Sequence, residues 1–256
     1  MSSSALITQR NEGTLALKPW LKGGIFNPRG DLPMSLKSLV LAASSALALS
    51  AGVAAAKDTI TIAMQLEPPH LDPTSAAAQA IDSVVYVNIF EGLTRFEGDG
   101  SIVPLLAKSW EISDDGLTYT FHLRDGVTFH NGRALTSADI KYSIERAVNP
   151  ETLSPGQGFF WMIDGFDAAA AGEADGLSGI ETPDDSTVVF TLSRPDATFL
   201  HVMAINFSFA VPQEVVEEFG ADFGKNPVGT GAFELTEWSL GQRLVFDRNE
   251  AYYHEG

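Results

Sequence analysis

The stretch PLLAKSWEISDDGLTYTFHLRDGVTFHNGRALTSADIKYSIERAVNP, residues 104–150, decides the fold. Within it, apolar and polar side chains alternate over residues 117–124, and this period of two predicts a half-buried strand. The turn signals Asp114-Asp115-Gly116 and Arg124-Asp125-Gly126 stand on either side of the strand. The chain therefore enters and leaves the strand by tight turns.

A second strand and a helix are expected directly after this one. Residues 127–130 read as a short strand, and Asn131-Gly132 supplies the backbone freedom of a tight turn. Apolar residues then recur at helical spacing over residues 138–148, with Thr136 or Ser137 as the cap. Since Asn149-Pro150 ends that helix, the stretch predicts a small sheet with one helix packed on it.

The order of residue types carries more information than the periodicity does. The informative positions are Leu93, Pro104, residues 105–107, Trp110, residues 117–121, 123–124 and 126–127, Phe129, and residues 131–132 and 138–140. With this spacing the chain resembles the family 5 extracellular solute-binding proteins, which are the oligopeptide- and dipeptide-binding components of ABC importers. The resemblance extends over about residues 59–253.

The resemblance implies an α/β fold of the periplasmic binding protein type (type II, cluster C), which has two lobes. Family members are roughly twice as long as this chain, so we expect only the first lobe with its inserted subdomain, truncated before the second lobe. The expected division is 57–79 for the first part of lobe I, 80–202 for the inserted subdomain and 203–256 for the return of lobe I.

The N-terminal region has the composition of an export signal. Residues 34–56 combine a basic start, an apolar run of small residues and an A-x-A pattern at residues 54–56, which predicts a secretory signal peptide cleaved before Lys57. A retained anchor helix is the alternative. We expect residues 1–33 to be a non-native extension, with Met34 rather than Met1 as the start.

Charge and cysteine content limit the partners. The chain has 16 Lys+Arg against 33 Asp+Glu, a net charge of −17, so nucleic acid and anionic membranes would repel it. It has no cysteine, which excludes disulfides and a lipid-accepting cysteine after the signal. These features favour a monomeric, freely diffusing protein of the Gram-negative periplasm.

The first candidate ligand-binding residues follow a predicted strand over residues 59–64. The strand runs into QLEPPHLDP, which includes Leu66 and Glu67, and loops after strand ends commonly meet ligands. In the resembling family this turn lies at the mouth of the cleft, and Glu67 falls where oligopeptide-binding members place a ligand-facing acid. A solvated loop carboxylate is the equally weighted alternative.

Tyr142 and Trp161 complete the candidate site. Tyr142 lies on the helix over residues 138–148, and Trp161 belongs to the apolar group 159–162 beside a Gly-rich loop. Aromatic residues in that position can line a pocket, but a place in the core is the more common outcome.

Further elements are expected along the chain. These are a helix over residues 76–90 stopped by Gly92, a strand over 187–192, helices over 196–204 and after Pro212, and a hairpin around Gly241 that joins strands near 233–235 and 244–246.

No catalytic, metal or cofactor motif is found. Five histidines form no H-E-x-x-H motif, although His122 and His130 could approach each other across adjacent strands. Because some members of the resembling family bind nickel or haem, such a member is one alternative to a peptide-binding protein, and a secreted hydrolase is the other. We expect no metal, no cofactor and no enzymatic activity.

The resemblance implies a function in import. The protein would capture di- or oligopeptides or similar small solutes by closing two lobes over them, and would deliver them to the membrane permease. Because the second lobe holds most of the ligand's end charges in such proteins, the solute is not specified by these residues. We expect this chain alone to bind peptide only weakly.

Overall fold

The computed structural model describes residues 59–75 and 77–254. The chain divides into two units, Met1–Thr61 and Ile62–Gly256, and the described helices and strands all belong to the second. The expected N-terminal extension and signal peptide lie outside the described residues and stay predictions. None of the described helices has the length and hydrophobicity that a membrane span needs.

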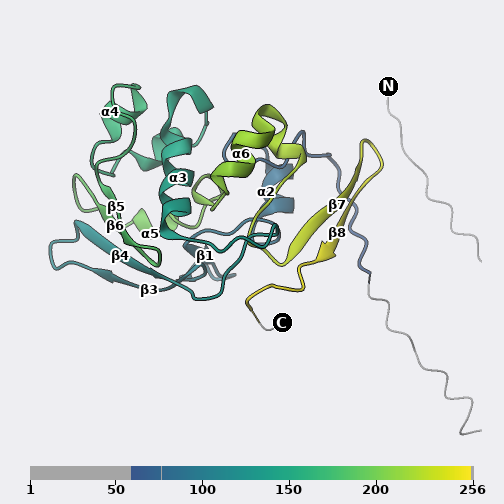
Figure 1. The fold of residues 1–256 in the computed structure, drawn as a ribbon, viewed down its shortest axis with the longest axis horizontal. Helices are drawn as coiled ribbons and strands as arrows, with labels where there is room; N and C mark the ends of the chain where they lie inside the picture. Colours follow the sequence, from purple (N-terminus) through teal and green to yellow (C-terminus); the bar gives the residue numbers. More distant parts are fainter. Residues whose placement is uncertain (1–58, 76, 255–256) are drawn as a thin grey trace, which may run out of the picture. The chain divides into compact units, whose positions relative to one another are not determined.

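An antiparallel sheet of four strands in the order β3-β4-β6-β5 carries the main core (Figure 1). Its strands are β3 (Ala107–Ile112), β4 (Thr118–Leu123), β5 (Ile180–Asp184) and β6 (Thr187–Thr191). β4 confirms the strand expected over residues 117–124, since its side chains alternate strictly between half-buried and buried. β6 pairs with β4 along its whole length and confirms the strand expected over residues 187–192.

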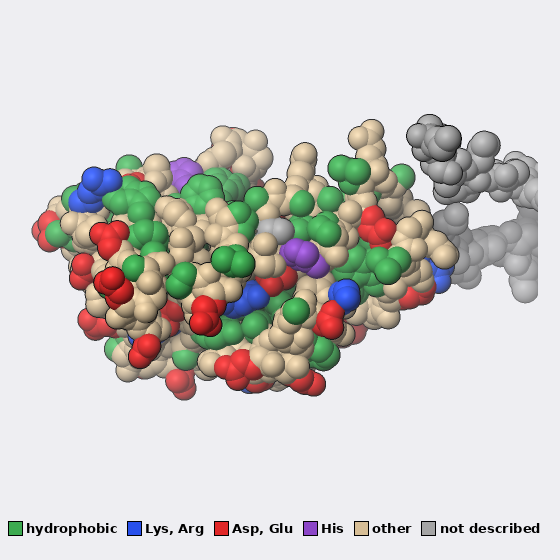
Figure 2. Space-filling model, turned by 90° about the horizontal axis from the view of Figure 1, so that it is seen from above, with side chains coloured by type: hydrophobic (Ala, Val, Ile, Leu, Met, Phe, Trp, Pro, Cys, Tyr) green, Lys and Arg blue, Asp and Glu red, His purple; other side chains and the backbone are tan. Residues whose placement is uncertain are grey.

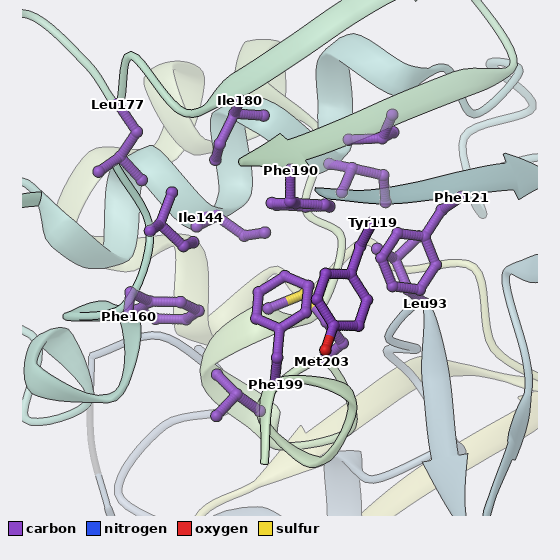
Figure 3. Close-up of a cluster of buried hydrophobic side chains, with 14 of the residues drawn as sticks. Leu93, Tyr119, Phe121, Ile144, Phe160, Leu177, Ile180, Phe190, Phe199 and Met203 are labelled. Atoms are coloured by element: carbon purple, nitrogen blue, oxygen red, sulfur yellow. The ribbon is translucent and has the colours of Figure 1, made fainter. Parts of the chain in front are cut away.

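Aromatic side chains fill one face of this sheet, and we call the cluster around them the sheet core (Figure 3). Phe190 of β6 meets Phe121 of β4 edge to face, with ring centroids 5.6 Å apart. Phe199, from the helix α5 (Phe199–Val202), lies 5.2 Å from Phe190 and 4.6 Å from Tyr119. The period of two in the sequence thus buries one side of β4 and β6 beneath a helical layer.

The helix α3 (Ser137–Val148) packs on the sheet, as expected for residues 138–148 (Figure 1). Thr136 is its N-cap, and its backbone N–H donates to the carboxylate of Asp139 in a capping box. Asp139 in turn forms a two-point ion pair with Arg133, which fixes the loop before the helix. Asn149 ends the helix, again as predicted.

The remaining elements are short. They are the helices α2 (Gln79–Val85), α4 (Phe166–Ala170) and α6 (Gln213–Phe219), the 3-10 turns η1 (Pro150–Thr152), η2 (Gln157–Phe160), η3 (Asn206–Ser208) and η4 (Gly220–Lys225), the paired strands β1 (Thr94–Phe96) and β2 (Ile102–Pro104), and the hairpin of β7 (Phe233–Ser239) and β8 (Arg243–Arg248). The hairpin around Gly241 confirms the sequence prediction. Pro212 and Gly220 cap α6 at its two ends, where the sequence places them.

A second core joins α2 to the hairpin. Ile81, Val85 and Phe90 are buried in it together with Phe223 of η4. Apolar side chains of β7 and β8 pack against it from one side, so the hairpin is attached to this second core rather than to the four-stranded sheet.

Two expected strands are not formed. Residues 59–64 have no strand pairing among the described residues, and Ile62 is 80% exposed. A period-two pattern gives a strand only where a neighbouring strand accepts its backbone hydrogen bonds, and none is present beside this segment in the described part of the chain. Residues 127–130 form only a single bridge, Thr128 to Ala134, because the chain turns back at once through Gly132.

Two helices are shorter than expected, and Gly92 has a different role. α2 ends at Val85 because Val87 adopts a left-handed φ of 57°, and α5 spans only Phe199–Val202. Gly92 is not a helix stop. A Cβ at this position would lie 2.5 Å from the carbonyl oxygen of Met203, so close approach of two backbones explains the glycine.

Candidate functional site

Glu67, the acidic candidate of the sequence, lies beside the tip of the β7–β8 hairpin. One carboxylate oxygen accepts a hydrogen bond from Trp238 Nε1 at 2.8 Å, and the other accepts from the backbone N–H of Gly241 at 2.8 Å. The side chain is therefore neither free in solvent nor buried. It fastens the QLEPPHLDP loop to a hairpin more than 150 residues later in the chain while it stays accessible.

A hollow of about 350 Å³ opens along the same hairpin. Its walls come from the end of α6, the loop after η4 and strand β7, and include Phe219, Val228, Leu235 and Trp238. Lys225 and Glu237 also line it, but Lys225 pairs with Asp222 at 2.8 Å and Glu237 pairs with Arg243 at 2.8 Å. Trp238 therefore links Glu67 directly to a concave surface that both apolar and polar side chains line.

The loop that carries Glu67 is fixed at its other end by a buried ion pair. Asp72 bonds both terminal nitrogens of Arg146 on α3, at 2.9 and 2.6 Å. Burial raises the pKa of Asp72, but the bonds from Arg146 and from the backbone N–H of Thr74 outweigh it and hold that pKa below its usual value. The loop is therefore anchored to α3 on one side and to the hairpin on the other.

The other candidate residues are held in different surroundings. Leu66 is 73% exposed next to Glu67. Tyr142 is half-buried on α3 and packs against the second core, while Trp161 packs against the sheet core with the guanidinium of Arg194 3.8 Å from its ring centre. Glu67 and Leu66 adjoin in the loop, but the structure records no bond from either to Tyr142 or Trp161.

The apolar group 159–162 divides between core and surface. Phe160 and Met162 are buried in the sheet core, whereas Phe159 is half exposed and stacks on Phe207 at 5.8 Å. The sequence favoured a place in the core for this group, and Phe160 and Met162 confirm that prediction.

His122 and His130 have separate partners. His122 on β4 lies 3.7 Å from Glu111, and His130 bonds the carbonyl oxygen of Gly231 at 3.0 Å. The approach that the sequence left open is not observed, because His130 lies in the turn of residues 129–132 rather than on a strand beside β4. Over residues 59–75 and 77–254, no three His, Cys, Asp or Glu side chains gather as a metal site would require.

Sequence reasoning missed two residues of interest. Trp238 is a partly buried aromatic residue of β7, and no local sequence pattern indicates its bond to Glu67. Glu91 was not singled out in the sequence, because its three hydroxyl partners come from segments far away in the chain.

The surface is acidic, as the composition requires. On the face drawn in Figure 2, acidic side chains are spread widely and basic ones are few. Several of the basic side chains are already paired with acids, among them Arg133, Arg146 and Arg243.

Comparison with known proteins gives consistent results. The family model of bacterial extracellular solute-binding proteins, family 5 Middle, matches residues 101–256. The probable deoxycholate-binding periplasmic protein YgiS of Escherichia coli is 36% identical over 191 residues, which cover 73% of this chain and 36% of that protein. The glutathione-binding protein GsiB of Pectobacterium atrosepticum is 31% identical over 218 residues, covering 85% of this chain and 39% of that protein.

Solved structures agree with these relatives. The Haemophilus influenzae OppA complex with the peptide RPPGFSPFR matches with a TM-score of 0.68 and 29% identity, over 73% of this chain and 37% of that one. The murein tripeptide-binding protein MppA of Escherichia coli matches with a TM-score of 0.68 and 34% identity, over 73% of this chain and 37% of that one.

These matches confirm the predicted α/β fold of the periplasmic binding protein type. The chain spans well under half of the length of the curated relatives that it matches. The relatives named are binding proteins, and the family consists of transport binding proteins rather than enzymes. The chain belongs to the bacterial extracellular solute-binding proteins of family 5.

Proposed function

We propose that this chain forms part of a periplasmic binding protein that captures peptides or similar small solutes and delivers them to the permease of an ABC importer. The observation that carries the proposal is membership of family 5, together with relatives named for peptides, glutathione and deoxycholate. Their variety supports a broad class of small solutes rather than one compound.

The candidate contact surface is the loop around Glu67 with the hairpin beside it. Each carboxylate oxygen of Glu67 accepts one hydrogen bond from the hairpin, which leaves a second lone pair on each for a backbone N–H of a ligand. Exposed Leu66 and the hollow beside Trp238 offer apolar contact. Tyr142 and Trp161 remain candidates as aromatic side chains of α3 and of the segment after it.

The expected affinity is low for this chain alone. A micromolar site corresponds to about 8 kcal/mol, and about half of that free energy corresponds to a millimolar dissociation constant. Since the chain spans well under half of the length of its relatives, we expect it to supply one side of the site only. A ligand held on one side keeps much of its hydration, which weakens each polar contact.

Binding can be tested through the indole N–H of Trp238. In ¹H–¹⁵N NMR spectra of the full chain, with the indole signal assigned by Trp238→Phe, we expect a saturable shift in the millimolar range on addition of di- to nonapeptides, glutathione or deoxycholate. Glu67→Gln removes the charge and is expected to weaken binding severalfold.

Glu111→Gln is the matched control, because Glu111 is an exposed carboxylate on β3, remote in sequence from the loop and the hairpin. Absence of any saturable shift across all three solute classes would contradict solute capture at this surface. Equal affinity of the Glu67→Gln and Glu111→Gln variants would remove Glu67 from the site.

A further inference from the structure

Glu91 is a completely buried carboxyl group without a cationic hydrogen-bond partner among the described residues. Its Oε1 accepts hydrogen bonds from the hydroxyls of Tyr252 at 2.9 Å and Tyr253 at 3.0 Å, and its Oε2 accepts from the hydroxyl of Thr230 at 2.8 Å. The two tyrosines follow β8, so this one carboxyl joins the segment after the hairpin to the residues after α2.

The backbone segments around Glu91 are closely packed. A Cβ on Gly229 would lie 1.9 Å from the carbonyl oxygen of Ile89, and one on Gly231 would lie 2.3 Å from that of Asn88, so the loop of Thr230 touches the backbone before Glu91. Asn249 fastens the other side, since its Nδ2 donates to the carbonyl oxygen of Gly231 at 3.0 Å.

Burial has the largest effect on the pKa of Glu91. It raises the pKa of Glu91 to about 7, although the three hydroxyl bonds and the positive charge of Arg124 favour the ionised form. Burial and the charge of Glu91 raise the pKa of both Tyr252 and Tyr253, so these hydroxyls remain protonated donors across the neutral range. Glu91 is thus the acidic member of the cluster that titrates near neutrality.

The two neighbouring histidines have the opposite tendency. Burial lowers the pKa of His130, which bonds the Gly229–Gly231 loop, and also that of His254, whose ring lies 4.6 Å from Tyr253. The charges of Arg124 and Arg95 lower the pKa of His254 further, and the charge of Glu234 partly offsets the shift of His130. If protonation of either histidine controlled how the segment of Tyr252 and Tyr253 packs on Glu91, acid would weaken that packing. The exposed imidazole ring would bind a proton more readily than the buried one.

We propose that Tyr252 and Tyr253 form a proton-linked latch over Glu91, which closes with uptake of one proton and loosens as the pH rises towards neutrality. In the closed, protonated form the proton lies on Oε2 and is donated to the hydroxyl oxygen of Thr230, while Oε1 still accepts from both tyrosines. In the open form Glu91 is hydrated and ionised. The two states therefore differ by one proton.

The direction of the pH effect follows from the two states. The open form has the ordinary carboxyl affinity for protons and the closed form a higher one, so closure is most favourable in acid. It weakens about tenfold for each pH unit between the two pKa values, and it becomes independent of pH once both states are ionised. This inference is independent of the proposed solute.

Hydrogen exchange of the backbone N–H of Tyr252 reports on the latch, because this group donates to the carbonyl oxygen of Asn249 at 3.1 Å. In the full chain we expect its protection factor to fall by about a hundredfold between about pH 5 and about pH 7, and to level off above that range. Glu91→Gln keeps the shape of the side chain but cannot titrate, so its protection should not vary with pH. His254→Asn should retain the wild-type profile.

The ¹³C signal of the Glu91 carboxyl in the wild-type chain gives a second measurement that does not require a variant to fold. A titration midpoint near neutrality supports the latch, and a midpoint in the ordinary glutamate range overturns it. Constant protection of Tyr252 across the pH range, an increase in its protection as the pH rises, or an unchanged slope in Glu91→Gln would overturn it as well.

Discussion

Replacing Phe190 with alanine is expected to lower the free energy of unfolding by about 3–5 kcal/mol. Phe190 is fully buried on β6, where its ring contacts Phe121 and Phe199 at the middle of the sheet core (Figure 3). It also stands opposite Tyr119 of β4 and Ile180 of β5 in the strand register. Removal of the ring leaves a cavity between β4, β5 and α5, which could be filled only if all three elements moved.

Two further variants separate this effect from a general loss of strand propensity. Phe190→Leu keeps most of the volume and should cost less than about 1.5 kcal/mol. Val189→Ala changes the next residue of β6, which points to the other, partly exposed face, and should cost at most about 1 kcal/mol. Urea denaturation measures all three, and a similar loss for Phe190→Ala and Val189→Ala would contradict the placement of the core on one face of the sheet.

Strand β4 and helix α3 could be predicted because their signals are local. Alternation in β4 specifies which side is buried, and Thr136 with Asp139 specifies where α3 begins. These interactions span a few residues, so the sequence contains all that is needed to recognise them. The same reasoning predicted the β7–β8 hairpin from the glycine at its turn.

The failures concern features that depend on distant partners. Residues 59–64 alternate as a strand should, but pairing is a property of two segments, and the described residues provide no second one. Gly92 has the position of a helix stop, and only the carbonyl oxygen of Met203 beside it explains why a side chain is excluded.

The candidate site shows the same limit more strongly. The family resemblance pointed to Glu67, but its bonds to Trp238 and Gly241 unite residues that lie far apart in the chain. The hydroxyls around Glu91 come from Thr230, Tyr252 and Tyr253, and no periodicity connects them to a glutamate so much earlier. Buried polar networks are specified by tertiary geometry, so a single sequence does not reveal them.

Replacing Arg146 with methionine is expected to lower the free energy of unfolding by about 3–5 kcal/mol at neutral pH, because it leaves the carboxylate of Asp72 buried without its counter-ion. The guanidinium also lies 5.5 Å from the ring centre of Phe223, so its loss removes a contact with the second core. Methionine retains most of the apolar stem, so the variant loses mainly the guanidinium with its charge, its hydrogen bonds and its contact with Phe223.

Lys225→Met provides a matched control for this effect. Lys225 pairs with Asp222 at 2.8 Å, but both side chains are about two thirds exposed, so loss of this pair should cost no more than about 1 kcal/mol. Thermal or urea unfolding of both variants measures the difference. Equal losses of unfolding free energy in the two variants would contradict the prediction. They would mean that Asp72 without Arg146 is destabilised no more than an exposed carboxylate is.

The pH dependence of the Arg146→Met variant distinguishes a charge effect from a packing effect. In the wild-type protein the pKa of Asp72 is held below its ordinary value of 3.8, so the pair contributes stability above that value and loses it as the pH falls through the lowered pKa. Without Arg146, burial is opposed only by the hydrogen bonds from Thr74 and Ser75, so the pKa of Asp72 is higher than in the wild type and acid neutralises the orphaned carboxylate more readily. The destabilisation should therefore shrink as the pH is lowered from neutrality.

A second variant, Asp72→Asn with Arg146→Met, removes both charges and should be more stable at neutral pH than Arg146→Met alone. If the double variant is instead the less stable, the penalty arises from lost packing and hydrogen bonds rather than from an unpaired buried charge.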